Sequence, residues 1–210
     1  IGEQINSILD QTHKNLTIRI TDDFSDPKEI KILQRLAKRN EDKIILNWNS
    51  SNLGPTQNFL RGLCLHAQDV PFYGWADQDD VWDKNKLARA LSLISKVDEK
   101  EPVLYCSRTK SFSHNVTEYL GYSPLFLKSP SFSNALMQSI AGGNTMVMNR
   151  TAKNVLVAAG YDLDVAAHDW WAYILISGAG GTIIYDTWPS VNYRQHKNNL
   201  IGSNNSFSAR

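Results

Sequence analysis

The chain has 210 residues, and its 22 lysines and arginines nearly balance its 21 aspartates and glutamates, leaving a formal charge of +1. This balance gives no electrostatic reason to expect a nucleic-acid partner, and we expect none. The longest apolar run, 173–185, contains three glycines and is too short to cross a bilayer, so we expect at most peripheral membrane association. The length suits one globular domain with a sizeable core.

Apolar residues in the first half alternate between helical and strand spacing. Pro27 and Pro55 are placed to open the second and third helices, and Asp83 to cap the fourth. This alternation predicts an α/β fold with a mostly parallel sheet flanked by helices. The expected helices lie near 5–9, 27–37, 55–64 and 83–94, and the expected strands near 16–20, 43–46, 72–75 and 103–105.

The second half is less regular. Segment 111–134 has no clear period and is expected to be an irregular, exposed connection. Beyond it we expect a strand at 145–148, a short helix from Thr151, a helix at 168–177 and a strand at 182–185. We treat 1–210 as one domain, with a regular half, 1–110, and a less regular half, 111–210.

Three carboxylates crowd into Asp77-Gln78-Asp79-Asp80, directly after the apolar strand. Two such charges about 4 Å apart repel by roughly 4 kcal/mol near a protein surface. Solvent offsets this repulsion if the run is only an acidic turn, and a bound metal offsets it otherwise. Asp22-Asp23 follow another strand, and parallel strands place their carboxyl ends at one ligand-binding edge. Oxygen ligands of this kind favour Mg²⁺ or Mn²⁺.

Five separated segments together resemble a family 2 glycosyltransferase of the nucleotide-diphospho-sugar transferase (GT-A-like) fold, especially its bacterial rhamnosyltransferase-like branch. Any one segment is weakly specific, but all five occur in family order and span nearly the whole chain. They are 3–12, Thr21-Asp22-Asp23-Phe24-Ser25-Asp26, 76–82, Ala141-Gly142-Gly143-Asn144-Thr145, and His168-Asp169-Trp170-Trp171 with Tyr193-Arg194-Gln195-His196.

The resemblance implies that residues 1–110 form the nucleotide-sugar-binding half and residues 111–210 the acceptor-binding and catalytic half. Asp23 matches the residue that hydrogen-bonds the nucleobase. Asp77 and Asp79 match the DxD pair, with Asp79 as the direct ligand of a metal bridging the donor's diphosphate and Asp77 in support. Gly142 and Gly143 match a glycine loop beside the donor sugar, where the missing Cβ atoms allow close approach, although a simple turn would use the same residues.

The resemblance also implies a catalytic base, Asp169, and a late metal- or diphosphate-binding histidine, His196. An inverting transfer needs such a base to take the proton of the acceptor hydroxyl. Asp169 also suits the start of a helix through the helix dipole, and His196 suits a polar surface. Trp170 and Trp171 are expected to share core packing with stacking on an acceptor sugar.

One further residue is a candidate without a firm match. Asn58 lies one turn into the third expected helix, where its amide could reach the nucleotide or simply face solvent.

Three functions are consistent with these residues. The first is a transfer of sugar from a UDP- or dTDP-linked donor to a glycan or lipid-linked acceptor, with inversion, in bacterial cell-surface polysaccharide synthesis. The expected location is cytoplasmic, at the inner face of the plasma membrane. The alternatives are a metal-dependent phosphohydrolase and a non-catalytic sugar- or nucleotide-binding module, for which six tryptophans and eight tyrosines offer stacking surfaces.

The chain departs from the family pattern at its start. It begins with Ile1-Gly2-Glu3 and lacks the family's first strand and its Thr-Tyr-Asn-like turn. We therefore expect a sheet that lacks one strand, a nucleotide pocket that lacks one wall, and weakened donor binding.

Overall fold

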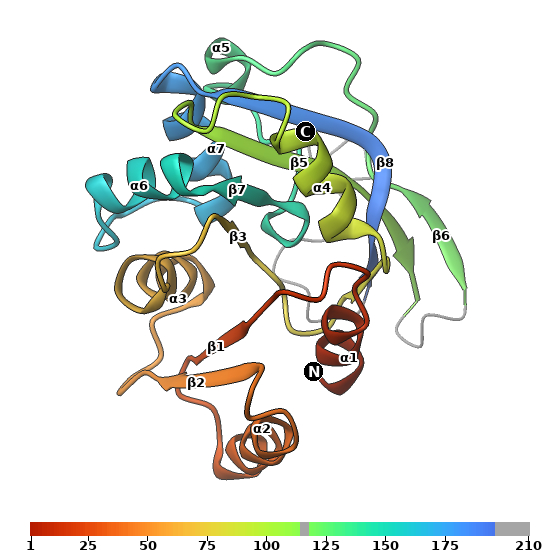
Figure 1. Ribbon diagram of the computed structural model, residues 1–210, viewed down its shortest axis with the longest axis vertical. Coiled ribbons are helices and arrows are strands. Elements are labelled where there is room, and N and C mark those ends of the chain that lie inside the picture. The colour runs from red at the N-terminus through yellow and green to blue at the C-terminus, as the bar shows by residue number, and fades with distance from the viewer. Residues whose placement is uncertain (114–117, 196–210) are drawn as a thin grey trace.

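A computed structural model describes residues 1–113 and 118–195 of the chain (Figure 1). Helices lie on both faces of a twisted sheet, and a smaller sheet lies near the N-terminus. The helices are α1 Gly2–Leu9, α2 Pro27–Arg39, α3 Pro55–Arg61, α4 Lys86–Ile94, α5 Phe132–Ala135, α6 Arg150–Ala159 and α7 His168–Gly178, with a π-helical turn at Gly62–His66 and a 3-10 turn at Gly143–Thr145. The strands are β1 Ile18–Asp22, β2 Ile44–Trp48, β3 Phe72–Gly74, β4 Val81–Trp82, β5 Val103–Phe112, β6 Tyr119–Tyr122, β7 Val147–Asn149 and β8 Thr182–Arg194.

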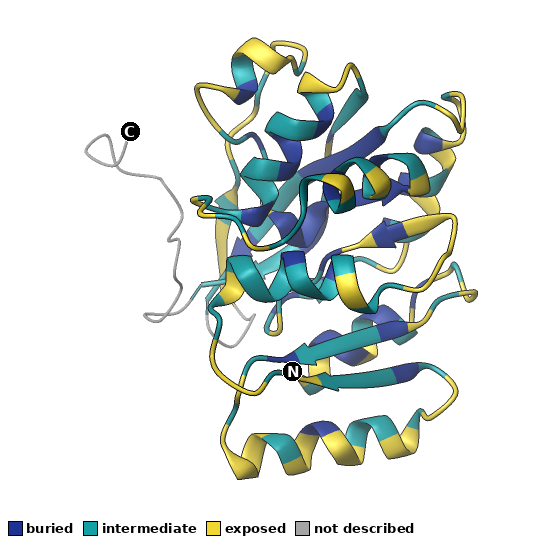
Figure 2. Ribbon diagram, turned by 90° about the vertical axis from the view of Figure 1, so that its left-hand side faces the viewer, coloured by how far each residue is buried: buried dark blue, intermediate teal, exposed yellow. Residues whose placement is uncertain are grey.

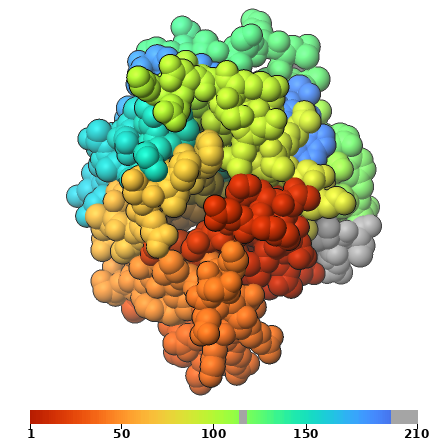
Figure 3. Space-filling model, viewed as in Figure 1, coloured from red at the N-terminus to blue at the C-terminus, as the bar shows by residue number. Residues whose placement is uncertain are grey.

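The strands form two separate sheets. In the smaller one β1 pairs with β2, with Ile18 opposite Ile44. The larger one has the order β3-β7-β5-β8-β4, and β6 pairs with β5. Within the described residues β1 has no strand partner on its other edge, in the region where Figure 3 shows a hollow between the red N-terminal segment and the segment of α3 and β3.

The strand pairings include more antiparallel pairs than the expected mostly parallel sheet would have. The two long pairings, β1 with β2 and β5 with β8, are parallel. The short pairings of β3 with β7, β5 with β7, β4 with β8 and β5 with β6 are antiparallel. The α/β class is as expected, and β3 and β7 lie at expected strands, but the alternation of helices and strands did not reveal their antiparallel pairing. It also missed β4 and β6, because strands of two to four residues leave almost no periodic pattern.

Several helix starts follow from the sequence. Asp26 caps α2, because its Oδ1 accepts the backbone N–H groups of Lys28 at 2.8 Å and Glu29 at 3.2 Å, and Pro27 fills the first helical position. The expected cap at Asp83 is wrong. Its Oδ1 instead accepts the N–H of Asn85 at 2.9 Å, and α4 begins only at Lys86.

The main core lies between the large sheet and helices α6 and α7, and its fully buried side chains include Leu104, Met148 and Ile176. Figure 2 shows the buried parts of the strands and helices in dark blue, with exposed residues in yellow on the outer helices and loops. A second cluster joins α1 to the small sheet through Ile5, Ile18 and Ile44. The first turn of α7 and the segment after β3 lie together, because the ring of His168 meets that of Trp75 at 4.8 Å between centroids.

Segment 111–134, expected to be irregular, contains β6 and the short helix α5. Its strand was missed because Tyr119, Leu120 and Tyr122 are all largely exposed and do not alternate. Among the described residues no helix has the length and apolar character needed to traverse a bilayer.

Candidate functional site

The acidic run Asp77–Asp80 forms the turn between β3 and β4. Asp80 is fully buried, and its carboxylate accepts the side-chain amide of Asn144 and, at 3.1 Å, the backbone N–H of Arg194. Burial raises the pKa of Asp80 to about 6, although these two hydrogen bonds act in the opposite direction. Asp80 therefore faces the interior, whereas Asp77 and Asp79 are only partly buried.

A buried lysine lies behind this turn. Lys86 has no exposed surface, and its ammonium donates to the carbonyl of Asn144 at 2.6 Å and lies 3.2 Å from the ring centroid of Trp82. Burial lowers its pKa well below the ordinary value, while the charges of Asp80 and Asp77 act to raise it. A fully buried lysine is rare unless it is paired, and the charges that act on Lys86 are those of Asp80 and Asp77 in the acidic turn.

Three neighbouring carboxylates affect the ionisation of Asp77. Its pKa is raised to about 7. Desolvation is the largest cause, and the charges of Asp80, Asp79 and Asp169 add to it. Asp169 comes from helix α7, which is distant in sequence, and the glycine loop joins it to the acidic turn, because Gly143 hydrogen-bonds to Asp169 and Asn144 to Asp80. A cation bound at this turn would relieve the repulsion.

Asp169 lies in the first turn of α7, where the helix dipole favours an acidic side chain. Its Oδ2 accepts the backbone N–H of Gly143 at 2.9 Å, and its Oδ1 accepts the N–H of Trp170 at 2.7 Å. The structure thus brings Asp169, the glycine loop and the acidic turn together, as the resemblance implies. The catalytic role of Asp169 stays a prediction.

The glycine loop packs tightly against α7. A Cβ atom on Gly143 would lie 2.5 Å from Nε2 of His168 and 3.3 Å from Cβ of Asp169. His168 is buried, stacks on Phe59 at 4.2 Å between ring centroids and meets Trp75 edge-on at 4.8 Å. Gly143 is therefore required by close packing and not only by a turn.

Asp23 and Asn58 meet through a residue that the sequence analysis did not single out. Nδ2 of Asn49 lies 2.9 Å from Oδ1 of Asp23 and 2.9 Å from Oδ1 of Asn58. Asp23 also accepts the backbone N–H groups of Leu53 at 2.9 Å and Gly54 at 2.8 Å. An ionised carboxylate offers about four acceptor positions, so Asp23 keeps room for a ligand while it shapes the loop before α3.

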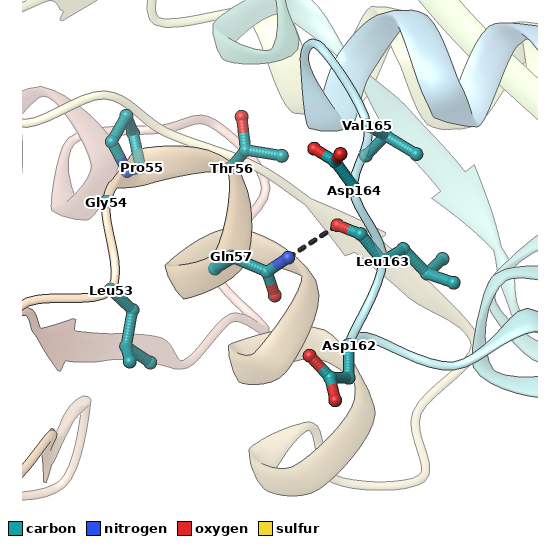
Figure 4. Close-up of a pocket in the computed structure, with 9 residues that line it drawn as sticks. All are labelled: Leu53, Gly54, Pro55, Thr56, Gln57, Asp162, Leu163, Asp164 and Val165. Carbon is teal, nitrogen blue, oxygen red and sulfur yellow. Dashed lines mark hydrogen bonds between the residues drawn. The ribbon is translucent and has the colours of Figure 1, made fainter.

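A cavity of about 340 Å³ adjoins this loop (Figure 4). It lies between residues 53–57 at the start of α3 and residues 162–165 before α7. The two sides are joined by a hydrogen bond of 2.5 Å from Nε2 of Gln57 to the carbonyl of Leu163. Thr56, Asp162 and Asp164 add hydroxyl and carboxylate groups to its wall. No motif in the sequence pointed to this cavity, because it joins segments about 100 residues apart.

The two tryptophans after Asp169 make structural contacts. The indole N–H of Trp170 donates to the carbonyl of Ala135 at 2.7 Å, and Trp171 packs against the main core. Both rings are partly exposed, so the expected half-core role agrees with their burial. Their contact with an acceptor sugar stays a prediction.

The expected metal ligands can be compared only in part, because His196 lies outside the described residues. Within 1–113 and 118–195, no three carboxylate, histidine or cysteine side chains gather closely enough to hold a metal ion. Asp77 and Asp79 provide hard oxygen donors next to repelling carboxylates, which fits Mg²⁺ or Mn²⁺ if diphosphate oxygens complete the ligand set.

Comparisons with known proteins decide the family. The family described as Glycosyl transferase family 2 matches residues 1–155. The chain belongs to glycosyl transferase family 2. Its curated relative "dTDP-rhamnosyl transferase RfbG" of Shigella flexneri is 26% identical over 222 aligned positions, which cover 100% of this chain and 73% of that protein.

Solved structures show the fold of this family 2 member. Staphylococcus aureus TarS 1–349 in complex with UDP has a TM-score of 0.65 and 16% identity over 93% of this chain and 56% of that one. The mannosyltransferase PcManGT from Pyrobaculum calidifontis, in complex with GDP-Man and Mn²⁺, has a TM-score of 0.65 and 19% identity over 94% and 54%. The chain thus has the expected nucleotide-diphospho-sugar transferase fold, and it spans a little over half of these two structures.

Proposed function

We propose that the chain transfers a sugar from a UDP- or dTDP-linked donor to a saccharide or lipid-linked saccharide acceptor, with inversion at the anomeric carbon. The observation that carries the proposal is the convergence of Asp169 with the acidic turn, because adjacent residues of the glycine loop, Gly143 and Asn144, hydrogen-bond to Asp169 and to Asp80. Membership in family 2 and similarity to a dTDP-rhamnosyl transferase support it. The likeness to a UDP complex of TarS also supports it.

The chemistry assigns opposite tasks to the two sides of the site. Asp169 accepts the proton of the acceptor hydroxyl as that oxygen attacks the anomeric carbon. The N–H groups of Gly143 and Trp170 each hold one carboxylate oxygen of Asp169, which fixes the carboxylate and leaves each oxygen a lone pair for the proton of the acceptor. Asp77 and Asp79 would hold a divalent cation, Mn²⁺ or Mg²⁺, and the chemistry it would supply is Lewis-acid stabilisation of negative charge on the leaving diphosphate. No second carboxylate is needed as a nucleophile, which is consistent with single-step inversion.

We assign donor recognition to Asp23 and the loop before α3. Asp23 accepts the imide N–H of uracil or thymine, and Asn58 stabilises the loop through Asn49. The adjoining cavity has a polar wall suited to hydroxyl groups of the donor or acceptor. We further propose that the protein acts in bacterial cell-surface polysaccharide synthesis, for which its similarity to a bacterial dTDP-rhamnosyl transferase is the support. The cytoplasmic face of the membrane is the location that we propose for this activity.

A thermal-shift screen of UDP-, dTDP- and GDP-sugars with and without Mn²⁺ tests donor class and metal together. We expect Asp79→Ala to lose the stabilisation that requires Mn²⁺. Asp169→Asn should keep it but lower the transfer rate at least 100-fold, because general-base catalysis contributes about 10²–10⁴-fold. Asp98→Ala removes an exposed carboxylate outside the site and should behave as the unmodified protein.

The outcomes separate the alternatives. A fully active Asp169→Asn protein would remove the base assignment. Hydrolysis of a simple phosphoester without sugar transfer would favour the phosphohydrolase, and donor binding without turnover would favour a binding module.

A further inference from the structure

The short segment Gly142–Thr145 connects the two sides of the proposed reaction site. On one side Asn144 contacts the buried carboxylate of Asp80. On the other side, one residue earlier, the N–H of Gly143 donates to Asp169 at 2.9 Å. The acidic turn and the base are therefore joined by a single peptide unit and the side chain of Asn144.

Asn144 is held at both its side chain and its backbone. Its side-chain amide donates to Asp80, and its carbonyl accepts the ammonium of Lys86 at 2.6 Å. Only 4% of Asn144 and 0% of Lys86 is exposed, so no solvent replaces these partners if they are lost. Asp80 is fixed in turn by the backbone N–H of Arg194 at 3.1 Å.

The segment has little freedom to move. The carbonyl of Gly142 accepts both the N–H of Thr145 at 3.0 Å and its hydroxyl at 2.8 Å. The N–H of Met146 donates to the carbonyl of Gly143 at 2.9 Å. A Cβ on Gly142 would lie only 2.9 Å from Oδ1 of Asn144, so the loop is closely packed as well as hydrogen-bonded. A displacement at Asn144 would pass directly to the N–H that holds Asp169.

We propose that Asn144, with its backbone locked by Lys86, is a positioning residue that fixes Asp169 relative to the acidic turn. The inference rests on the proposed function, because the distance between base and leaving group matters only if both act in one reaction. Misplacing a reacting group by about 1 Å costs on the order of 10²-fold in rate. Asn144 acts through Asp80 and Gly143 and needs no contact with the substrate.

The test compares two buried asparagines. Asn149 is 6% exposed, and its side chain makes three hydrogen bonds, accepting the N–H groups of Val103 at 3.0 Å and Ala152 at 2.9 Å and donating to the carbonyl of Glu101 at 2.7 Å. It lies away from the acidic turn. We expect both Asn144→Ala and Asn149→Ala to lower the melting temperature. Only Asn144→Ala should lower kcat, by about 10–100-fold, with the KM for the donor changed less than about threefold.

A second readout does not depend on turnover. The amide N–H of Gly143 donates a hydrogen bond to the carboxylate of Asp169, so the NMR chemical shift of this proton reports the contact. We expect this signal to move in Asn144→Ala and in Lys86→Met but not in Asn149→Ala. An unchanged Gly143 signal in Asn144→Ala, or equal kcat losses in the two asparagine variants, would overturn the positioning role. Absence of sugar transfer by the unmodified protein, with the Gly143 signal responding as expected, would instead reject the proposed function alone.

Discussion

At the residue scale, the neutral state of His168 is a consequence of its surroundings. Burial lowers its pKa to about 4, while the charge of Asp169 acts to raise it. Within the described residues its buried Nε2 has no hydrogen-bond partner. The ring therefore serves as packing between Phe59, Trp75 and the glycine loop, and it stays uncharged at neutral pH.

This pKa predicts a loss of stability in acid. The unfolded state, with a histidine pKa of 6.5, takes up its proton before the folded state does, so His168 lowers the free energy of unfolding as the pH falls from 6.5 to 4. The full effect is about 3 kcal/mol. Asp77 gives the opposite slope, because its raised pKa of about 7 stabilises the folded state most at low pH and this contribution is lost as the pH rises.

The comparison with His168→Phe isolates the histidine, since Asp77 is common to both proteins. Urea unfolding between pH 7.5 and 4.5 should show the unmodified protein losing stability relative to His168→Phe on acidification. Parallel stability curves for the two proteins would contradict the assignment.

At the residue scale, too, the sequence could identify Asp23, Asp77, Asp79 and Asp169 as candidates because each occurs in a recognisable local pattern. It could not identify Asn144 or Lys86. The hydrogen bond between them spans 58 positions, and an asparagine after two glycines or a lysine in a helix has many ordinary explanations. Their contribution comes from burial, which local sequence does not specify.

At the element scale, the glycine loop and α7 form one packed unit. Substituting Gly143 by alanine places a methyl group against His168, whose ring is held between Phe59 and Trp75 and cannot easily move. We expect Gly143→Ala to lower the free energy of unfolding by about 1–3 kcal/mol. It should also weaken sugar transfer by displacing Asp169.

Gly2→Ala is the matched control, since a Cβ at Gly2 would meet nothing within 4 Å. Urea denaturation of both variants gives the comparison. If the two substitutions change stability equally, the close packing around Gly143 is not a constraint.

The elements differ in how well their sequences predict them. Helix α2 is recognisable from Asp26, Pro27 and its apolar spacing. The expected strand at 182–185 is only the first part of β8, which continues to Arg194. Pro189 made this continuation hard to predict, because proline cannot donate to a strand ladder, and the pairing with β5 shifts register near that position.

At the scale of the whole molecule, the family resemblance predicted the fold better than periodicity did. The spacing of apolar residues predicted the longer helices and the strands β1 and β2 but missed α5, β4 and β6. The assignment of donor binding to 1–110 and acceptor binding to 111–210 stays a prediction. Val81 and Trp82 of β4 pair with β8 across more than 100 intervening residues, so local spacing could not predict this strand.

The separation of the two sheets has a consequence for local unfolding. Strands β1 and β2 share five paired positions, and α2, which packs beside β2, has Leu33 as its buried residue. The large sheet, in contrast, has fully buried residues along β5, such as Val103 and Tyr105. Segments with few buried contacts open in smaller cooperative units than the whole domain.

Amide hydrogen exchange should therefore be faster in β1 and β2 than in β5 and the paired part of β8. Equal protection across both sheets would show that the molecule opens only as a whole. Because Asp23 follows β1 directly, the proposed donor would bind the less protected part of the chain and slow its exchange. Donor binding would then carry an ordering cost that a continuous sheet would not impose.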